Sequence, residues 1–203
     1  MPYFDRTQKQ IRIKCVCIPC NTGWMKALED AVIPLVGPMG DGWHKTLDVL
    51  QQWAIARWAL AKAMVWEFIT VGHEIFYSKE ERVLLKSGTI PPNTVVWLAG
   101  HVGRETFYAA GNRASSRSGV VPHLEGYFTT MAYKRLVVQV MSIRPYEHTD
   151  PYTLLDCDQA TFANAIVRIW PTTSQSFWPP TDILADNMLQ SFHKRCGGST
   201  VKG

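Results

Sequence analysis

The hydrophobic pattern of this chain changes its period at Pro91-Pro92. Before that point apolar residues recur every three or four positions, as in amphipathic helices, and after it they alternate with polar residues, as in strands. Helices followed by strands favour an α+β fold with an antiparallel sheet. We therefore expect one domain over residues 1–203, with a strand, turn and helix in 1–37, helices in 38–90, and a sheet plus a terminal helix in 91–203.

Start and stop signals place the expected helices. Thr22 is a candidate N-cap for a helix that ends at Gly37-Pro38, and Ser78-Lys-Glu-Glu81 has the spacing of a capping box for a helix that ends near Gly88. A long helix is expected between them, over Thr46–Ile69. Its predicted buried stripe comprises Leu47, Leu50, Trp53, Ala54, Trp58, Ala61 and Val65. The last helix is predicted to open at Pro179-Pro180-Thr181-Asp182.

Alternation of apolar and polar residues places the expected strands. A first strand is predicted over Ile11–Ile18. The antiparallel strands after Pro92 are predicted at 94–99, 105–110, 127–133, 136–143 and 165–170. The segments that join them, Gly100–Gly103, Gly111–Gly119 and Lys134-Arg135, are rich in glycine or polar residues and are predicted to be turns or loops.

The net charge of +4 is concentrated at one end of the sequence. Residues 1–26 hold five basic side chains and one acidic side chain, whereas the remainder holds 16 of each. Arg6, Lys9, Arg12 and Lys14 are therefore candidate contacts for a polyanion such as nucleic acid, the alternative being a solvated terminus. No apolar leader opens the sequence, and no stretch is apolar enough for a membrane span. The five cysteines are an odd number and three of them are clustered, which is not the pattern of a secreted disulfide framework, so we expect a cytoplasmic protein.

Three of these cysteines, Cys15, Cys17 and Cys20, lie within six residues. Two cysteines three positions apart on a turn can direct both thiolates at one zinc ion, which takes four ligands in a tetrahedron. Cys15 is a candidate third ligand. The fourth would come from His44, His193, Cys157 or Cys196, or from a second chain in a homodimer. The alternative is that the three cysteines are ordinary buried thiols.

The segment Cys17-Ile-Pro-Cys20-Asn21-Thr-Gly23-Trp24-Met25, followed by Leu28-Glu29, resembles part of a known family. It is similar to the second zinc knuckle and following helix of bacterial and phage HNH-endonuclease-like proteins. The resemblance implies that Asn21 is a ligand of the catalytic divalent ion. It also implies that an earlier Cys-x-x-Cys completes the zinc site, and that an acidic-His pair supplies the general base.

The chain departs from this pattern before Cys15. The fourteen preceding residues contain no Cys, His or Glu, and the first histidine is His44. We therefore expect a non-catalytic protein on a degenerate HNH scaffold that binds nucleic acid or a nucleic-acid-handling protein complex. Such a protein would suit a phage or mobile-element inhibitor of a host defence nuclease. The alternative is a metal-dependent endonuclease whose base lies elsewhere in the fold, or in a longer chain of which this sequence is a piece.

A second candidate for anion binding is the donor-rich segment 112–119. It contains Arg113 and Arg117 among serine and glycine residues. Backbone and side-chain donors in such a loop can surround a phosphate. The alternative is a solvated loop.

Overall fold

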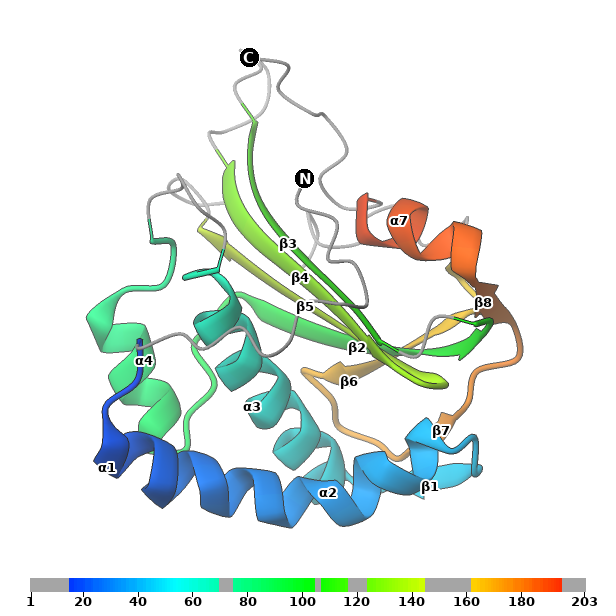
Figure 1. Ribbon diagram of the computed structural model, residues 1–203, viewed down its shortest axis with the longest axis horizontal. Coiled ribbons are helices and arrows are strands. Elements are labelled where there is room, and N and C mark those ends of the chain that lie inside the picture. Colours follow the sequence, from blue (N-terminus) through cyan, green and yellow to red (C-terminus); the bar gives the residue numbers. More distant parts are fainter. Residues whose placement is uncertain (1–14, 70–74, 105–106, 117–123, 145–161, 195–203) are drawn as a thin grey trace.

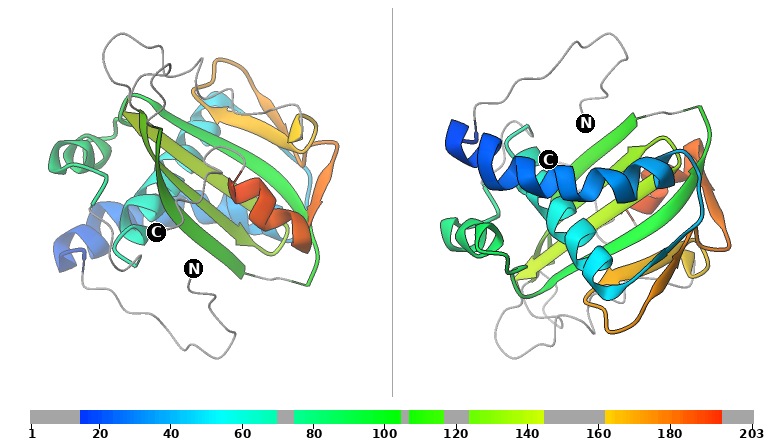
Figure 2. Two further views of the ribbon diagram at one scale, coloured as in Figure 1. Left: turned by 90° about the horizontal axis from the view of Figure 1, so that it is seen from above. Right: turned by 90° about the horizontal axis from the view of Figure 1, so that it is seen from below.

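The structure is a computed structural model that describes residues 15–69, 75–104, 107–116, 124–144 and 162–194. Helices dominate the first part of the described chain and strands the second, so the expected α+β class is confirmed. Two long helices cross one face of a sheet, and a shorter C-terminal helix lies on the other face (Figures 1 and 2).

The helical part comprises α1 (Ile18–Cys20), η1 (Asn21–Met25), α2 (Lys26–Gly40), α3 (Val49–Trp66) and α4 (Lys79–Lys86). The first three form one rod with a kink at Gly23, whose φ of −95° and ψ of −111° are not helical. Capping boxes begin α3 and α4. The Gln51 N–H donates to the Asp48 carboxylate at 2.8 Å, and the Glu81 N–H donates to the Ser78 hydroxyl at 3.2 Å. The capping box predicted at Ser78 is confirmed.

The main sheet has the strand order β3-β4-β5-β2-β6, and all of these neighbours are antiparallel. Its strands are β2 (Thr94–Val102), β3 (Phe107–Ser116), β4 (Leu124–Tyr133), β5 (Leu136–Arg144) and β6 (Ile166–Trp170). A short strand, β8 (Ile183–Ala185), runs parallel to the end of β2. A separate ribbon pairs β1 (Lys45–Leu47) with β7 (Ser176–Trp178). All five predicted sheet strands are confirmed, as is the tight turn at Lys134-Arg135.

Both faces of the sheet are covered, which explains the composition of its central strands. On one face α3 packs on Val96, Val138 and Val140 in the largest core. On the other face α7 (Asp186–Lys194) packs Leu189 and Phe192 near Val137. Eight of the nine residues of β2 and of β5 are buried as a result. Burial of one large apolar side chain contributes about 1.5–3 kcal/mol, so these two strands anchor the fold.

We expected an N-terminal strand over residues 11–18, but the part of this segment that the structure describes is not a strand. Residues 11–14 lie outside the described residues, Cys15–Cys17 forms no regular element, and Ile18 begins α1. Pro19 favours this outcome because its fixed φ suits the first turn of a helix. Thr22 is not the N-cap that we predicted, because its hydroxyl donates to the Ile18 carbonyl within the helical rod.

Other predicted boundaries were also wrong. The rod continues through Pro34 and Pro38 to Gly40. Residues 111–116 extend β3 instead of forming a loop, because each of them pairs with β4 in an unbroken register. Helix α7 starts at Asp186, later than expected, because β8 occupies the residues before it.

The predicted buried stripe of the long helix was partly confirmed, because Leu47 and Ala61 are buried and Trp53, Ala54 and Trp58 pack against the core. Leu50 is 76% exposed, whereas Ile55, Ala56, Ala59 and Leu60 are completely buried. Helix α3 contacts both α2 and the sheet, so its buried surface is wider than the single stripe that a surface helix presents.

Candidate functional site

The Cys-x-x-Cys-Asn segment occupies the start of the helical rod, at the end remote from β1 (Figure 1). We call Cys17, Cys20 and Asn21 the cysteine end. Cys17 and Asn21 are exposed and Cys20 is half-buried, and no residue of α1 is buried. The Cys20 side chain is close enough to Cys17 to be the main cause of a lowered pKa of the Cys17 thiol. The two thiols are therefore close together at the protein surface.

The other half of the motif packs the rod onto α3. Met25 and Leu28 are buried, and Glu29 forms an ion pair with Lys62 of α3. The Arg57 guanidinium carbon lies 5.7 Å from the ring centroid of Trp24, a cation–π distance. These contacts account for the tryptophan, methionine, leucine and glutamate of the motif. They do not involve Cys17, Cys20 or Asn21.

Arg57 also ties the rod to α4. Its guanidinium lies 5.5 Å from the Trp53 ring and donates to the carbonyls of Leu85 and Lys86, both at 3.1 Å. Burial lowers the pKa of Arg57, although an arginine in protein remains charged. One side chain thus holds the C-terminal end of α4 beside the cysteine end.

Two cations of α4 act on the cysteines. The pKa of Cys17 is lowered, mainly because the Cys20 side chain hydrogen-bonds to it, and the charge of Lys86 acts in the same direction. Burial raises the pKa of Cys15, an effect that its own backbone hydrogen bond and Arg82 partly oppose. We did not predict Arg82 and Lys86 as part of this site. Their spacing of four residues in a helix was the available signal, because it places both on one face.

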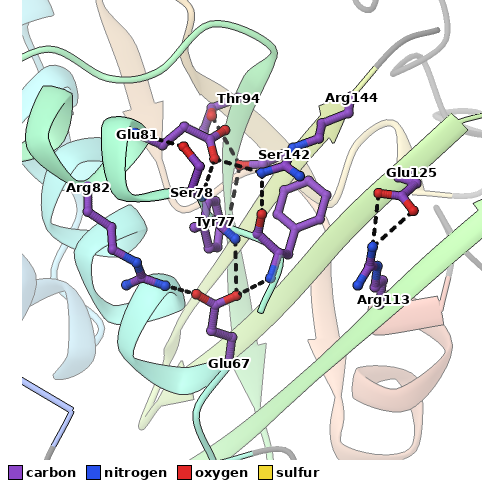
Figure 3. A network of polar contacts seen from close by, with 11 residues as sticks. Glu67, Tyr77, Ser78, Glu81, Arg82, Thr94, Arg113, Glu125, Ser142 and Arg144 are labelled. Atoms are coloured by element: carbon purple, nitrogen blue, oxygen red, sulfur yellow. Dashed lines mark hydrogen bonds and ion pairs between the residues drawn. The ribbon is translucent and has the colours of Figure 1, made fainter. Parts of the chain in front are cut away.

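A polar network fixes the other end of α4 (Figure 3). The buried Glu67 carboxylate accepts the N–H groups of Phe76 at 2.8 Å and Tyr77 at 3.2 Å, and forms an ion pair with Arg82. Arg144 of β5 pairs with Glu81 at 2.9 Å. The position of α4 relative to α3 and the sheet is therefore set by charged hydrogen bonds, which are among the stronger ones in proteins.

The cysteine end fits half of a zinc site. A structural zinc takes four ligands, and Cys17 and Cys20 supply two that are already adjacent. Among the described residues, no group of three or more His, Cys, Asp or Glu side chains could hold a metal. His44 follows the opposite end of α2, and His193 lies in α7 on the other face of the sheet. Cys157 and Cys196 lie outside the described residues.

The predicted anion contacts are not brought together in the described chain. Arg113 lies in β3 and pairs with Glu125 of β4, with nitrogen–oxygen distances of 2.9 and 3.0 Å (Figure 3). A phosphate would have to compete with this carboxylate. Arg117 and the basic residues Arg6, Lys9, Arg12 and Lys14 lie outside the described residues. Asn21 is exposed and remains a candidate ligand.

Comparison of the chain with protein-family models, curated proteins and solved structures finds no match. None of the helices in the described ranges is long and apolar enough to cross a membrane.

Proposed function

We propose that this chain is a binding protein built on a degenerate HNH-like scaffold. Its ligand is nucleic acid or a protein complex that handles nucleic acid, and it does not cut the strand. The observation that carries the proposal is the division of the motif into a packing half and an exposed half. Trp24, Met25, Leu28 and Glu29 make the contacts that pack the rod on the fold, whereas Cys17 and Asn21 are exposed and Cys20 is half-buried. Side chains that are not needed to pack the fold are available to contact a ligand.

The positions of the described histidines support a role without cleavage. Hydrolysis of a phosphodiester at an HNH-type site needs a general base beside the attacked phosphate. His44 is exposed beyond the far end of α2, His101 is hydrogen-bonded within the sheet region, and His193 is hydrogen-bonded to Thr130 under α7. None of these three lies beside Asn21. His73, His123 and His148 lie outside the described residues.

The distribution of positive charge along the sequence supports a polyanionic ligand. Six of the fourteen described lysines and arginines pair with carboxylates, as in Lys26–Asp30, Lys62–Glu29, Arg113–Glu125 and Lys134–Asp41. The sequence excess of positive charge lies in residues 1–26, where one acidic side chain faces five basic ones. Sequence-independent contacts between such cations and phosphates supply most of the affinity of non-specific nucleic-acid binding.

The binding test is a salt titration with fluorescently labelled duplex DNA and RNA. We expect log K to fall linearly with log salt concentration, and replacement of Arg6, Lys9, Arg12 and Lys14 by glutamine should reduce that slope by about 3 to 4. The matched control replaces four described cations that lie outside the cysteine end, Lys45, Lys79, Arg168 and Lys194, by glutamine; Lys45 is half-buried and the other three are exposed. Equal slopes for the two quadruple variants would contradict specific use of the N-terminal segment.

The cleavage test uses plasmid DNA with Mg²⁺, Mn²⁺ or Ni²⁺. We expect no multiple-turnover cleavage by the parent protein or by Asn21→Ala. Metal-dependent cleavage that Asn21→Ala abolishes would replace the binding proposal with the endonuclease alternative, because it would show that a base from another part of the chain serves this site.

A further inference from the structure

A pocket of about 270 Å³ lies at the opposite end of α2 from the cysteine end. Three backbone turns enclose it: the end of α2, the end of β2, and the two-residue turn between β4 and β5. Its lining residues are Gly40, Asp41, His101, Val102, Gly103, Lys134 and Arg135. We call it the turn pocket. It takes no part in the function proposed above, and none of its residues was predicted as a site from the sequence.

Backbone hydrogen bonds hold the three turns together. The Arg135 N–H donates to the Gly40 carbonyl at 3.1 Å, and the Arg135 carbonyl accepts the His101 N–H at 2.8 Å. The carbonyls of Gly37, Pro38 and Met39 accept the N–H groups of Asp41, Trp43 and Gly42. The last carbonyls of α2 are thus all satisfied by the backbone. The cationic side chains of the pocket are not needed as hydrogen-bonding caps for this helix.

His101 forms the floor of the pocket, with 1% of its side chain exposed. Its Nδ1 lies 2.9 Å from the Lys134 carbonyl oxygen, and its Nε2 lies 2.8 Å from the Asp186 carboxylate. Both ring nitrogens therefore have partners within the protein, which fixes the orientation of the ring. The other oxygen of the Asp186 carboxylate accepts the Arg104 N–H at 2.9 Å.

The charged side chains that line the pocket are two cations, Lys134 and Arg135, and one carboxylate, Asp41. Lys134 pairs with Asp41 at 2.6 Å, which neutralises the carboxylate that lines the pocket. The side chain of Arg135 extends across Gly42, where a Cβ atom would lie 2.6 Å from the arginine Cδ. Within the described ranges, neither Arg135 nor the neighbouring Arg104 has an ion-pair partner. Both side chains are exposed.

We propose that the turn pocket binds a phosphate group through Arg135 and Lys134. A guanidinium presents two parallel N–H donors that match two oxygens of a phosphate, and an ammonium adds a point charge. Gly40 and Gly103 line the pocket with backbone alone, and neither leaves room for a side chain, because a Cβ would lie 2.8 Å from the Tyr133 ring at Gly40 and would overlap the Asp186 carboxylate at Gly103. A divalent cation is a poor fit because the carboxylate in the lining, Asp41, is already paired with Lys134.

The first test is titration with inorganic phosphate, followed through the amide NMR signals of residues 40–42, 101–104 and 134–136. We expect saturable shifts confined to these turns. Arg135→Gln should weaken the affinity about tenfold, as loss of a charged hydrogen bond does, and Asp41→Asn should strengthen it up to about fivefold by releasing Lys134. The matched control is Arg168→Gln, an exposed arginine on β6 that does not line the pocket.

Three outcomes would overturn the proposed phosphate site: NMR shifts that do not saturate, equal weakening of phosphate affinity by Arg135→Gln and Arg168→Gln, or no strengthening of that affinity by Asp41→Asn.

The source of the phosphate is identified by comparing a nucleoside monophosphate with an oligonucleotide that carries or lacks a 5′-phosphate. Tighter binding of the phosphorylated oligonucleotide than of the other two would identify a nucleic-acid end, and equal binding of the two phosphorylated ligands would identify a free nucleotide. Because the pocket and the cysteine end lie at opposite ends of α2, failure here leaves the tests of the proposed function unaffected.

Discussion

Glu67 is the one acidic side chain in the described ranges that is buried, with 3% of the side chain exposed. A buried carboxylate destabilises a fold by several kcal/mol unless hydrogen bonds and an opposite charge compensate it. Glu67 has both, because two backbone N–H groups donate to it and Arg82 pairs with it (Figure 3). It therefore joins the end of α3 to the chain that enters α4.

We expect Glu67→Gln to lower the free energy of unfolding by on the order of 3 kcal/mol, because it leaves the partly buried Arg82 without its counter-charge. Urea denaturation followed by tryptophan fluorescence measures this change. The matched control is Glu29→Gln, which breaks a pair with Lys62 that is more than one-third exposed on both sides. Glu29→Gln should lower the free energy of unfolding by less than about 1 kcal/mol. A similar small loss in both variants would mean that Glu67 is not an anchor.

At the scale of single residues, the sequence predicted the candidate ligands and not their surroundings. Cys17, Cys20 and Asn21 were identified because a local motif contains them. The pairing of Arg113 with Glu125 was not predictable in the same way, because it depends on the register between β3 and β4. The contact of Arg57 with Trp24 likewise joins two helices that are separate in sequence.

Among the elements, those with local signals were predicted best. The capping box at Ser78 and the alternating strands from Thr94 to Ile143 are determined by neighbouring residues, and the structure confirms them. The start of α7 was misplaced because β8 forms only by pairing with the distant β2. The first strand was misplaced because Pro19 starts a helix where alternation predicted extended chain.

Helix α7 carries a titratable group in its buried face. His193 is 1% exposed, and its Nδ1 lies 3.0 Å from the Thr130 hydroxyl of β4. Burial lowers the pKa of His193 to about 4, and the charge of Lys194 contributes in the same direction. The ordinary value is 6.5, so the unfolded chain takes up this proton at a higher pH than the folded protein does. Folding stability from this group is therefore complete above pH 6.5 and is lost as the pH falls toward 4.

We expect His193 to reduce the free energy of unfolding by about 3 kcal/mol between pH 7 and pH 4. His193→Asn places a neutral amide where Nδ1 lies and should remove this part of the pH dependence, as measured by urea denaturation across the range. His44→Asn is the control, because His44 is exposed and the same substitution there should leave the profile unchanged. If His193→Asn kept the parent profile, the acid sensitivity would come from other groups.

For the whole molecule, the order of helices and strands followed from the sequence, whereas the strand order did not. The β2 strand pairs with β5 and β6 and not with the next strand in sequence, an arrangement that depends on long-range packing. Residues of α2, α3, β2, β5 and β6 all enter the largest core, so the helical rod and the sheet are packed as one body. At the cysteine end of the rod, Cys17 and Asn21 are exposed and Cys20 is half-buried.

Two copies of the chain would together supply the four ligands of a structural zinc site. Each chain offers Cys17 and Cys20 as adjacent thiols, and four thiolates from two chains form the tetrahedral set that a structural zinc prefers. The lowered pKa of Cys17 favours the thiolate that binds the metal. Ile18, 78% exposed between the two cysteines, would be covered by the second copy. Cys15, whose pKa is raised by burial, is the less suited ligand.

We therefore expect purified protein to contain about one zinc per two chains and to sediment as a dimer that chelator converts to monomer. Cys17→Ser should remove both the zinc and the dimer, because a hydroxyl is a poor zinc ligand. Cys15→Ser is the matched control and should keep both, since the four thiolates come from Cys17 and Cys20. Loss of zinc in both variants, with one zinc per chain in the parent, would instead indicate a site within one chain that includes Cys15. Zinc far below one per two chains, in a protein that sediments as a monomer, would remove the shared site, and the cysteine end would then bind its partner without metal.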